Sequence, residues 1–176
     1  GQIIDNPCGT CGGNGVLKKQ RTVKVTIPPG MDSGKRISLR GEGDAGPNGG
    51  PAGDLYVVVR VRPHEHFERQ GNDLYCMIPI TMTQAALGAE IQVPTLDGER
   101  VGLNIPAGTQ NEKLFRIRNY GVPRLQDSSR RGDLYVKIHV EVPKKLSGKA
   151  KKILREFAEV EGENASPDPV PLSRLG

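Results

Sequence analysis

Two cysteines near the start of the chain have the spacing of metal-binding or redox-active thiols. The stretch NPCGTCGGNG, residues 6–15, holds Cys8 and Cys11 in a C-x-x-C arrangement, with Gly13 and Gly15 close behind. Such a pair supplies half of a tetrahedral zinc site, which needs four ligands. The only other cysteine, Cys76, comes 65 residues after Cys11. The spacing therefore predicts half of a zinc site and raises the question of where the other half lies.

Three interpretations of Cys8 and Cys11 remain open from the residues alone. They are zinc ligands, a thioredoxin-like redox pair, or inert thiols. The redox interpretation lacks the βαβ pattern that accompanies such a motif. Because two thiolates cannot close a four-ligand cage, we expect this chain to hold little or no stoichiometric zinc. Cys76, within DLYCMI, is predicted to be a buried strand residue rather than a ligand.

Apart from the C-x-x-C pair, no residue pattern in the chain favours catalysis. His64 and His66, within PHEHF, lack a second cluster of ligands or acids and fit a surface turn. Arg69, Gly71 and Asp73 fit a linker and a turn. No Ser-His-Asp pattern, phosphate-binding loop or carboxylate pair stands out. We therefore expect a protein that is not an enzyme.

Composition and charge exclude several function classes. The net charge of +5 is spread among 25 basic and 20 acidic residues, and aromatic residues make up 4% of the chain. Scattered charge and few aromatics argue against a zinc-ribbon protein that binds specific nucleic acid. No apolar run is long enough to span a bilayer. Three cysteines without a closed disulfide framework favour a reducing, cytoplasmic location.

An internal repeat organises the chain. RTVKVTIPPG (Arg21–Gly30) aligns with ERVGLNIPAG (Glu99–Gly108) at an offset of 78 residues, and GDLYV occurs both at Gly53 and at Gly132. Further pairs at the same offset are Lys35 with Lys113, Ile37 with Phe115, Leu39 with Ile117, Arg40 with Arg118, and Gly43 with Gly121. Ordered matches of this kind predict two tandem homologous β domains.

Each repeat is predicted to consist of short strands. Val23, Val25 and Ile27 alternate with polar residues, as in a half-buried strand. The segments RISLR and LFRIR, and the two segments that begin with DLYV, are predicted as further strands. The second repeat adds residues 72–101, with a strand, a helical turn near 83–87 and a hairpin turn at Asp97-Gly98. Asp54 and Asp133 are expected to serve turns that enter strands.

A different pattern follows the second repeat. Apolar residues at 150, 153, 154, 157 and 158 have helical spacing, and Ser147 is a suitable N-cap. The fold class is therefore mostly β, with two tandem homologous small β-sandwich-like domains and a C-terminal amphipathic helix. The predicted parts are a cysteine-rich remnant at 1–15, a first β domain at 16–64 that lacks its opening strands, a second at 65–143, a helix at 144–162 and a disordered tail at 163–176.

The motifs resemble those of the DnaJ co-chaperone family. CGTCGGNG is similar to one C-x-x-C-x-G-x-G repeat of that family, and IPPGMDSGKRISLRGEGDAG, AALGAEIQVPTLDG and IPAGTQ resemble its C-terminal substrate-binding region. The resemblance implies that Cys8 and Cys11 belong to the last of four cysteine repeats, which bind two zinc ions in the intact protein. The family's J domain, with its His-Pro-Asp tripeptide, and three cysteine repeats are absent from this sequence.

The resemblance also implies a function and a set of site residues. Extended apolar segments of unfolded polypeptides would be added as a strand to the first domain and held for a DnaK-type chaperone. Val23 and Val57 match positions that line the apolar pocket for the client, although periodicity alone would place them in the core. The C-terminal segment would form a homodimer through Ile153, Leu154 and Phe157. The competing hypothesis is a thiol–disulfide oxidoreductase that acts through Cys8 and Cys11.

Overall fold

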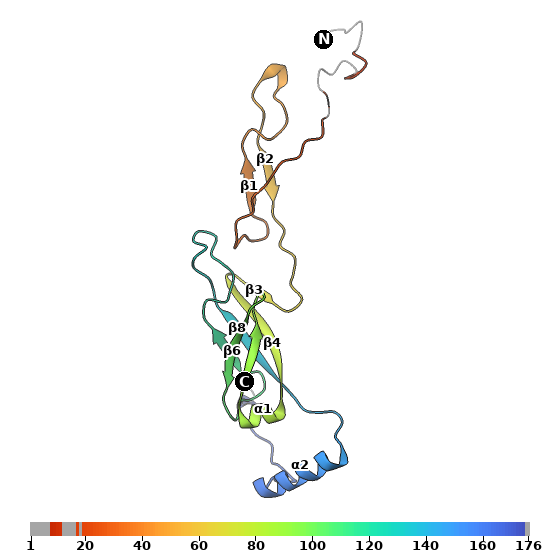
Figure 1. The fold of residues 1–176 in the computed structure, drawn as a ribbon, viewed down its shortest axis with the longest axis vertical. Helices are drawn as coiled ribbons and strands as arrows, with labels where there is room; N and C mark the ends of the chain where they lie inside the picture. Colours follow the sequence, from red (N-terminus) through yellow and green to blue (C-terminus); the bar gives the residue numbers. More distant parts are fainter. Residues whose placement is uncertain (1–7, 12–16, 18, 175–176) are drawn as a thin grey trace. The chain divides into compact units, whose positions relative to one another are not determined.

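The computed structural model describes residues 8–11, 17 and 19–174 and shows a mostly β protein (Figure 1). The chain divides into two compact units. Unit 1 comprises residues 1–74 and 118–134, and unit 2 comprises residues 75–117 and 135–176. The mostly β class and the C-terminal helix predicted from the sequence are confirmed.

Unit 1 contains an antiparallel hairpin made from the first repeat. Strand β1 (Arg36–Leu39) pairs with β2 (Leu55–Val58), with Ile37 opposite Val57. The connection includes the short 3-10 helix η1 (Pro47–Gly49). Both strands were predicted from the sequence, and β2 ends at Val58.

A four-stranded sheet carries most of the buried core. Its strand order is β3 (Glu68–Gln70), β4 (Asp73–Thr81), β8 (Leu134–Glu141) and β7 (Leu114–Ile117). Burial alternates along the two central strands, as expected for a sheet with one packed face. The buried residues of β4 and β8 are Leu74, Cys76, Ile80, Leu134, Val136 and Ile138. The predicted burial of Cys76 is therefore confirmed.

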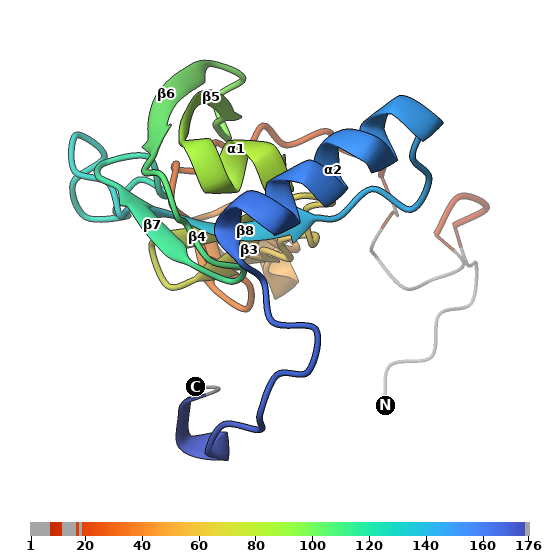
Figure 2. The same cartoon turned by 90° about the horizontal axis from the view of Figure 1, so that it is seen from below.

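A helix and a second hairpin complete this part of the fold. Helix α1 (Met82–Leu87) begins with a capping box, in which the Thr81 hydroxyl accepts from the Gln84 N–H and the Gln84 side chain accepts from the Thr81 N–H. Strands β5 (Ala89–Pro94) and β6 (Arg100–Ile105) form the antiparallel hairpin predicted around Asp97-Gly98. Figure 2 shows α1 and this hairpin from below.

The C-terminal helix α2 (Gly148–Glu161) has both of its ends capped. The Ser147 hydroxyl accepts a hydrogen bond from the Ala150 N–H at 3.2 Å, and Gly162 ends the helix in the left-handed conformation. The predicted N-cap is thus confirmed. Residues 163–171 form neither helix nor strand, and a 3-10 turn, η2 (Leu172–Arg174), follows.

Hydrogen bonds reproduce the sequence repeat position by position. Val59 exchanges two backbone bonds with Gly34 and Lys35, and Ile138 exchanges the equivalent two with Glu112 and Lys113. Side-chain caps repeat as well: the Val61 N–H donates to Ser33, and the Val140 N–H donates to Asn111. Such agreement in detail supports a shared local fold for the two repeats.

One predicted strand does not form. Residues 21–28 have the alternating pattern of a strand, yet no strand is assigned to them. The equivalent residues of the second repeat form β6, which pairs with β5. A strand needs a neighbour for its backbone groups, and no counterpart of β5 is present among the described residues of unit 1. The prediction of a strand was wrong here, because an alternating pattern shows which side chains share a face but not whether a neighbouring strand is present to pair with.

Candidate functional site

The apolar face of the first repeat is more open than the same face of the second. Leu55 and Val57 on β2 are only half-buried. Their counterparts on β8, Leu134 and Val136, are 0% exposed. Val23, the other predicted pocket residue, is also half-buried. The same sequence pattern is therefore a closed core in one repeat and an accessible surface in the other.

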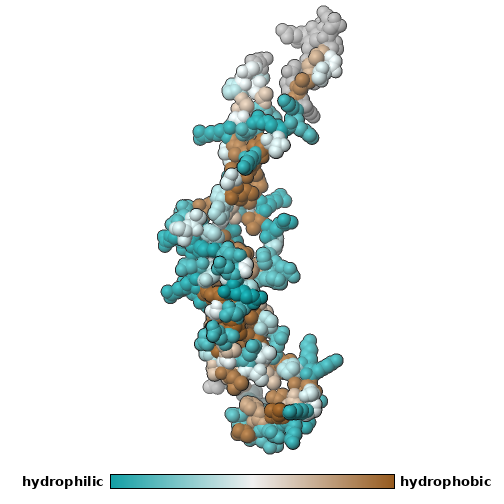
Figure 3. Space-filling model, viewed as in Figure 1, coloured by the Kyte–Doolittle hydropathy of each residue, from teal (hydrophilic) through white to brown (hydrophobic). Residues whose placement is uncertain are grey.

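Ile27 shows a large difference in exposure between the repeats. Its side chain is 57% exposed, whereas that of Ile105, its counterpart 78 residues later, is 1% exposed. Tyr56 and Val58, on the outer side of β2, are exposed as well. In Figure 3 hydrophobic atoms gather over β1 and β2. Exposed apolar surface of this kind marks a binding site more often than a single exposed residue does.

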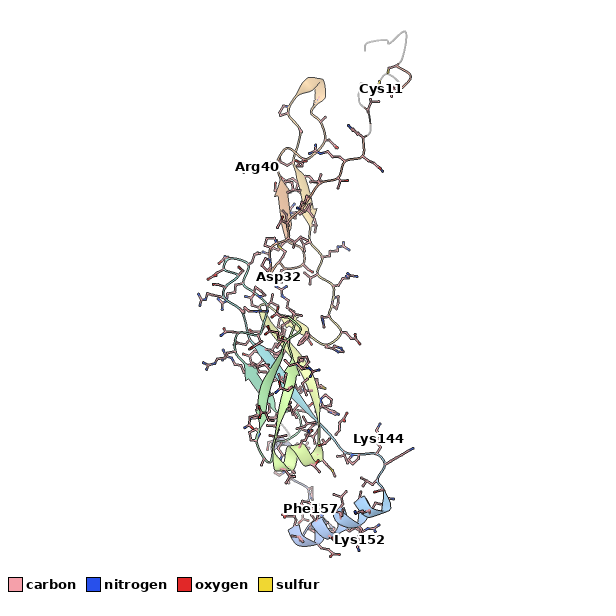
Figure 4. The ribbon with its side chains drawn as sticks, viewed as in Figure 1. Cys11, Asp32, Arg40, Lys144, Lys152 and Phe157 are labelled. Carbon is pink, nitrogen blue, oxygen red and sulfur yellow. The ribbon has the colours of Figure 1, made fainter. Side chains whose placement is uncertain are left out.

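The turn that follows Ile27 is held by an arginine from β3. Arg69 donates to the carbonyl oxygens of Met31 at 2.9 Å, Gly30 at 3.1 Å and Gly71 at 2.8 Å. It also forms an ion pair with Asp32 at 2.7 Å. Asp32 lies in the turn that precedes β1 (Figure 4). A planar guanidinium with several fixed donors suits such a cluster of carbonyls.

Backbone packing holds the same turn from its other side. Gly30 has a φ of 82°, and a Cβ at this position would clash with the carbonyl oxygen of Pro123. Only glycine combines that φ with so close an approach. The sequence predicts a linker and a turn around Arg69 and does not indicate this role. Its partners in the turn are 38 and 39 residues away, and no local signal in the sequence indicates them.

The two thiols near the N-terminus lie together but do not form a complete metal site. Cys8 is exposed, and hydrogen bonds from the backbone N–H groups of Thr10 and Cys11, with the Cys11 side chain, lower its pKa to about 7. A lowered thiol pKa suits a metal ligand or a nucleophile. In the part of the chain that the structure describes, no group of three or more His, Cys, Asp or Glu side chains could hold a metal. The described residues therefore do not fit a closed zinc cage.

The remaining candidates from the sequence have structural environments. Burial raises the pKa of the Cys76 thiol to about 11, which makes it a poor ligand or nucleophile at neutral pH. The rings of His64 and Phe67 pack at a tilted angle with their centroids 5.1 Å apart, and the His64 Nδ1 accepts a hydrogen bond from the His66 N–H at 3.0 Å. The side chain of Asp73 accepts a hydrogen bond from the Asp133 N–H. A structural role therefore accounts for each of these residues.

Helix α2 has an apolar stripe that its own chain leaves accessible. Ile153 is 54% exposed and Phe157 51% exposed, Leu154 is half-buried, and no residue of α2 is buried. Figure 4 labels Phe157 on this helix. Val160, which is not among the predicted stripe residues, extends the stripe by one turn and is exposed. Its i+3 spacing from Phe157 is the signal that could have identified it.

Among the residues that the structure describes, no helix has both the length and the apolar content required to cross a lipid bilayer.

Comparison with known proteins identifies the family of this chain. Residues 10–143 match the model of the DnaJ C terminal domain. The chain therefore belongs to the DnaJ family, as its motifs indicated. It is 56% identical over 163 residues to the chaperone protein DnaJ of Acetivibrio thermocellus, and 52% identical over 187 aligned positions to that of Treponema denticola.

The matches cover most of this chain but less than half of each relative. The alignment with the Acetivibrio protein spans 93% of this chain and 42% of the relative, and the alignment with the Treponema protein spans 98% and 48%. Both relatives are named as chaperones. Nothing in these names supports the alternative of a thiol–disulfide oxidoreductase.

Proposed function

We propose that this chain is the part of a DnaJ-type chaperone that holds extended apolar segments of unfolded polypeptides. The observation that carries the proposal is the open apolar face of the first repeat, since Val57 is half-buried where Val136 is fully buried. A hydrophobic side chain of a client would occupy the space beside Val23 and Val57. Main-chain hydrogen bonds would add affinity that tolerates many sequences.

The proposal extends to the partners of the whole protein. A DnaK-type chaperone would receive the client, in the cytoplasm, and the role of this chain would be binding rather than catalysis. Cys8 and Cys11 would hold zinc together with two further thiolates from the complete cysteine module. Dimerisation through the apolar stripe of α2 would place two client sites in one particle and raise the effective concentration at the second site.

Suppression of aggregation tests the client-binding proposal. We expect the 176-residue chain to reduce light scattering by a denatured client protein, and Val57→Asp to abolish that effect. Val142→Asp is the matched control, because Val142 is an exposed valine that lies outside the proposed site. Equal suppression by both variants would contradict the assignment of the site. The double variant Cys8→Ser, Cys11→Ser should keep full suppression, whereas a thiol–disulfide mechanism requires its loss.

A further inference from the structure

The connection from β2 to β3, residues 59–67, carries the chain out of the first repeat (Figure 1). Both of its ends are tied to one turn of that repeat. Val61 donates its N–H to the Ser33 hydroxyl at 2.7 Å, and Arg69, on β3, donates to the Met31 carbonyl oxygen at 2.9 Å. The residues between these two anchors form a loop whose ends are held while its middle is exposed.

The ring of His64 closes a turn in the middle of this loop. Its Nδ1 accepts a hydrogen bond from the His66 N–H at 3.0 Å. A ring nitrogen that accepts a hydrogen bond carries no proton, so this contact requires the neutral imidazole with its proton on Nε2. Asparagine and aspartate close turns in the same way, by accepting from the backbone two residues further on. In this loop the acceptor is a group that titrates near neutral pH.

We propose that residues 62–67 are a pH-sensitive hinge, closed while His64 is neutral and opened when it is protonated. Histidine side chains ordinarily titrate near pH 6.5, so the change takes place between about pH 5 and pH 8. In the imidazolium both ring nitrogens carry protons, and the proton on Nδ1 points at the His66 N–H. The turn thereby loses its acceptor and gains a repulsion between two donors, which frees the residues between the anchors.

The charged groups around His64 favour opening and leave the anchors in place. The ring of His66, with its centroid 6.1 Å from that of His64, gains positive charge in the same pH range. The Glu65 carboxylate lies 4.0 Å from the far nitrogen of His66, Nε2, and both side chains are exposed, so this pair contributes little. At the anchors, the guanidinium of Arg69 stays protonated and the Ser33 hydroxyl stays neutral. The response to acid is therefore confined to the loop.

Nuclear magnetic resonance of the isotope-labelled 176-residue chain tests the hinge directly. The His64 ring nitrogen shifts should show an unprotonated Nδ1 at about pH 8 and a protonated one at about pH 5. Over the same titration the protection of the His66 amide, corrected for the intrinsic exchange rate at each pH, should fall about fivefold, the ratio expected for one hydrogen bond. The Leu74 amide, which donates to the Asp133 carbonyl oxygen, reports on the fold and should keep its protection.

Three substitutions separate the chemistry of the ring from the shape of the turn. His64→Asn keeps an acceptor that does not titrate, so the amide at position 66 should stay protected at both pH values. His64→Ala removes the acceptor and should leave this amide unprotected at both. His66→Asn is the matched control, because it replaces the neighbouring exposed histidine, keeps His64 and should therefore keep the response to pH.

Proteolysis gives a second measurement of the same opening. A protease that cleaves after glutamate should cut at Glu65 about fivefold faster at acidic pH, relative to a peptide of residues 60–70 that corrects for the enzyme's own pH dependence. His64→Asn should abolish this acceleration. A protonated Nδ1 at about pH 8, protection of the His66 amide that does not change with pH, or an equal response in His64→Asn would overturn the proposal. A parallel loss of protection at Leu74 would assign the change to global unfolding and would overturn it as well.

Discussion

The carboxylate of Asp133 accepts a hydrogen bond from the backbone N–H of Asn119 at 2.9 Å. In the first repeat the carboxylate of Asp54 accepts the equivalent bond from the Gly41 N–H at 3.0 Å. The Asp-Leu-Tyr motif therefore ties the loop of each repeat to the start of its last strand. A pair of aspartates that could suggest catalysis has the same turn-closing role twice.

Removal of either aspartate should lower stability. We expect Asp54→Ala and Asp133→Ala each to lower the free energy of unfolding by about 1 kcal/mol, the usual cost of losing a hydrogen bond that caps a backbone N–H. Asp→Asn at either position keeps an acceptor oxygen and should cost less. Urea unfolding followed by circular dichroism measures both. A variant with normal stability but no client binding would contradict the structural role.

Two left-handed backbone positions hold glycine in the first repeat and another residue in the second, namely Gly34 with Glu112 and Gly41 with Asn119. Gly34 has a φ of 83°, and Glu112, its counterpart, has a φ of 66°. A left-handed conformation costs a residue with a Cβ about 1–2 kcal/mol, and glycine adopts it without that strain. Gly34→Ala should therefore destabilise the chain by about 1 kcal/mol. Glu112→Gly should raise the midpoint of urea unfolding slightly, since relief of strain exceeds the added entropy of the unfolded chain. A loss of stability in Glu112→Gly would refute this explanation.

Replacement of Arg69 should lower the free energy of unfolding more than replacement of a surface arginine would. Its side chain is 21% exposed and contacts three carbonyl groups. Arg69→Met should cost about 2 kcal/mol of unfolding free energy, because hydrogen bonds that involve a charged group contribute more than neutral ones. The ion pair with Asp32 adds little, as Asp32 is 55% exposed. Asp32→Asn is therefore the control and should be close to wild type.

The exchange of backbone amides gives a second measurement for Arg69. In Arg69→Met the amides that follow Gly30 should exchange faster, because the carbonyl groups of the turn lose their donor. Arg69→Lys should restore little of the slow exchange of these amides, since an ammonium group cannot donate to several carbonyls with the planar geometry of a guanidinium. Full rescue by lysine would mean that charge alone, rather than the set of hydrogen bonds, holds the turn.

The burial of Cys76 should make the stability of the protein decrease at alkaline pH. Burial raises the pKa of its thiol from 9.0 to about 11, so the folded state holds this proton more strongly than the unfolded state. The corresponding stability is fully present below pH 9 and is lost as the pH rises from 9 towards 11. Under reducing conditions the midpoint of urea unfolding should decrease between about pH 8 and about pH 10.5, and the decrease should be larger for the wild type than for Cys76→Ala. Equal decreases would contradict the effect of burial.

The apolar stripe of α2 should control the oligomeric state. Burial of a large apolar side chain contributes ~1.5–3 kcal/mol when it is complete, so the three predicted residues support a dimer that dissociates on dilution. Ile153→Asp together with Phe157→Asp should give a folded monomer in sedimentation velocity. Lys151→Asp, on the polar side of the helix, is the control. A wild-type chain that stays monomeric at high concentration would show that this stripe has another role.

The sequence alone determined the features that depend on local chemistry. The C-x-x-C pair, the repeat at 78 residues, the Asp97-Gly98 hairpin and the Ser147 cap could be predicted because neighbouring residues specify them. The assignment to the DnaJ family rests on the same kind of signal, since family motifs are short and contiguous. The roles of Asp54 and Asp133 in turns also followed from their places beside glycine.

Only the tertiary structure decided which patterned residues are covered. Val25 and Leu103 share one alternating pattern, yet β6 has a partner strand and residues 21–28 form no strand. The role of Arg69 likewise depends on carbonyl groups 38 and 39 residues away. Periodicity reports which side chains share a face, whereas burial and strand pairing depend on which distant segment lies against that face. Ile27 and Ile105 therefore differ in exposure for a reason that their own neighbours in the sequence do not contain.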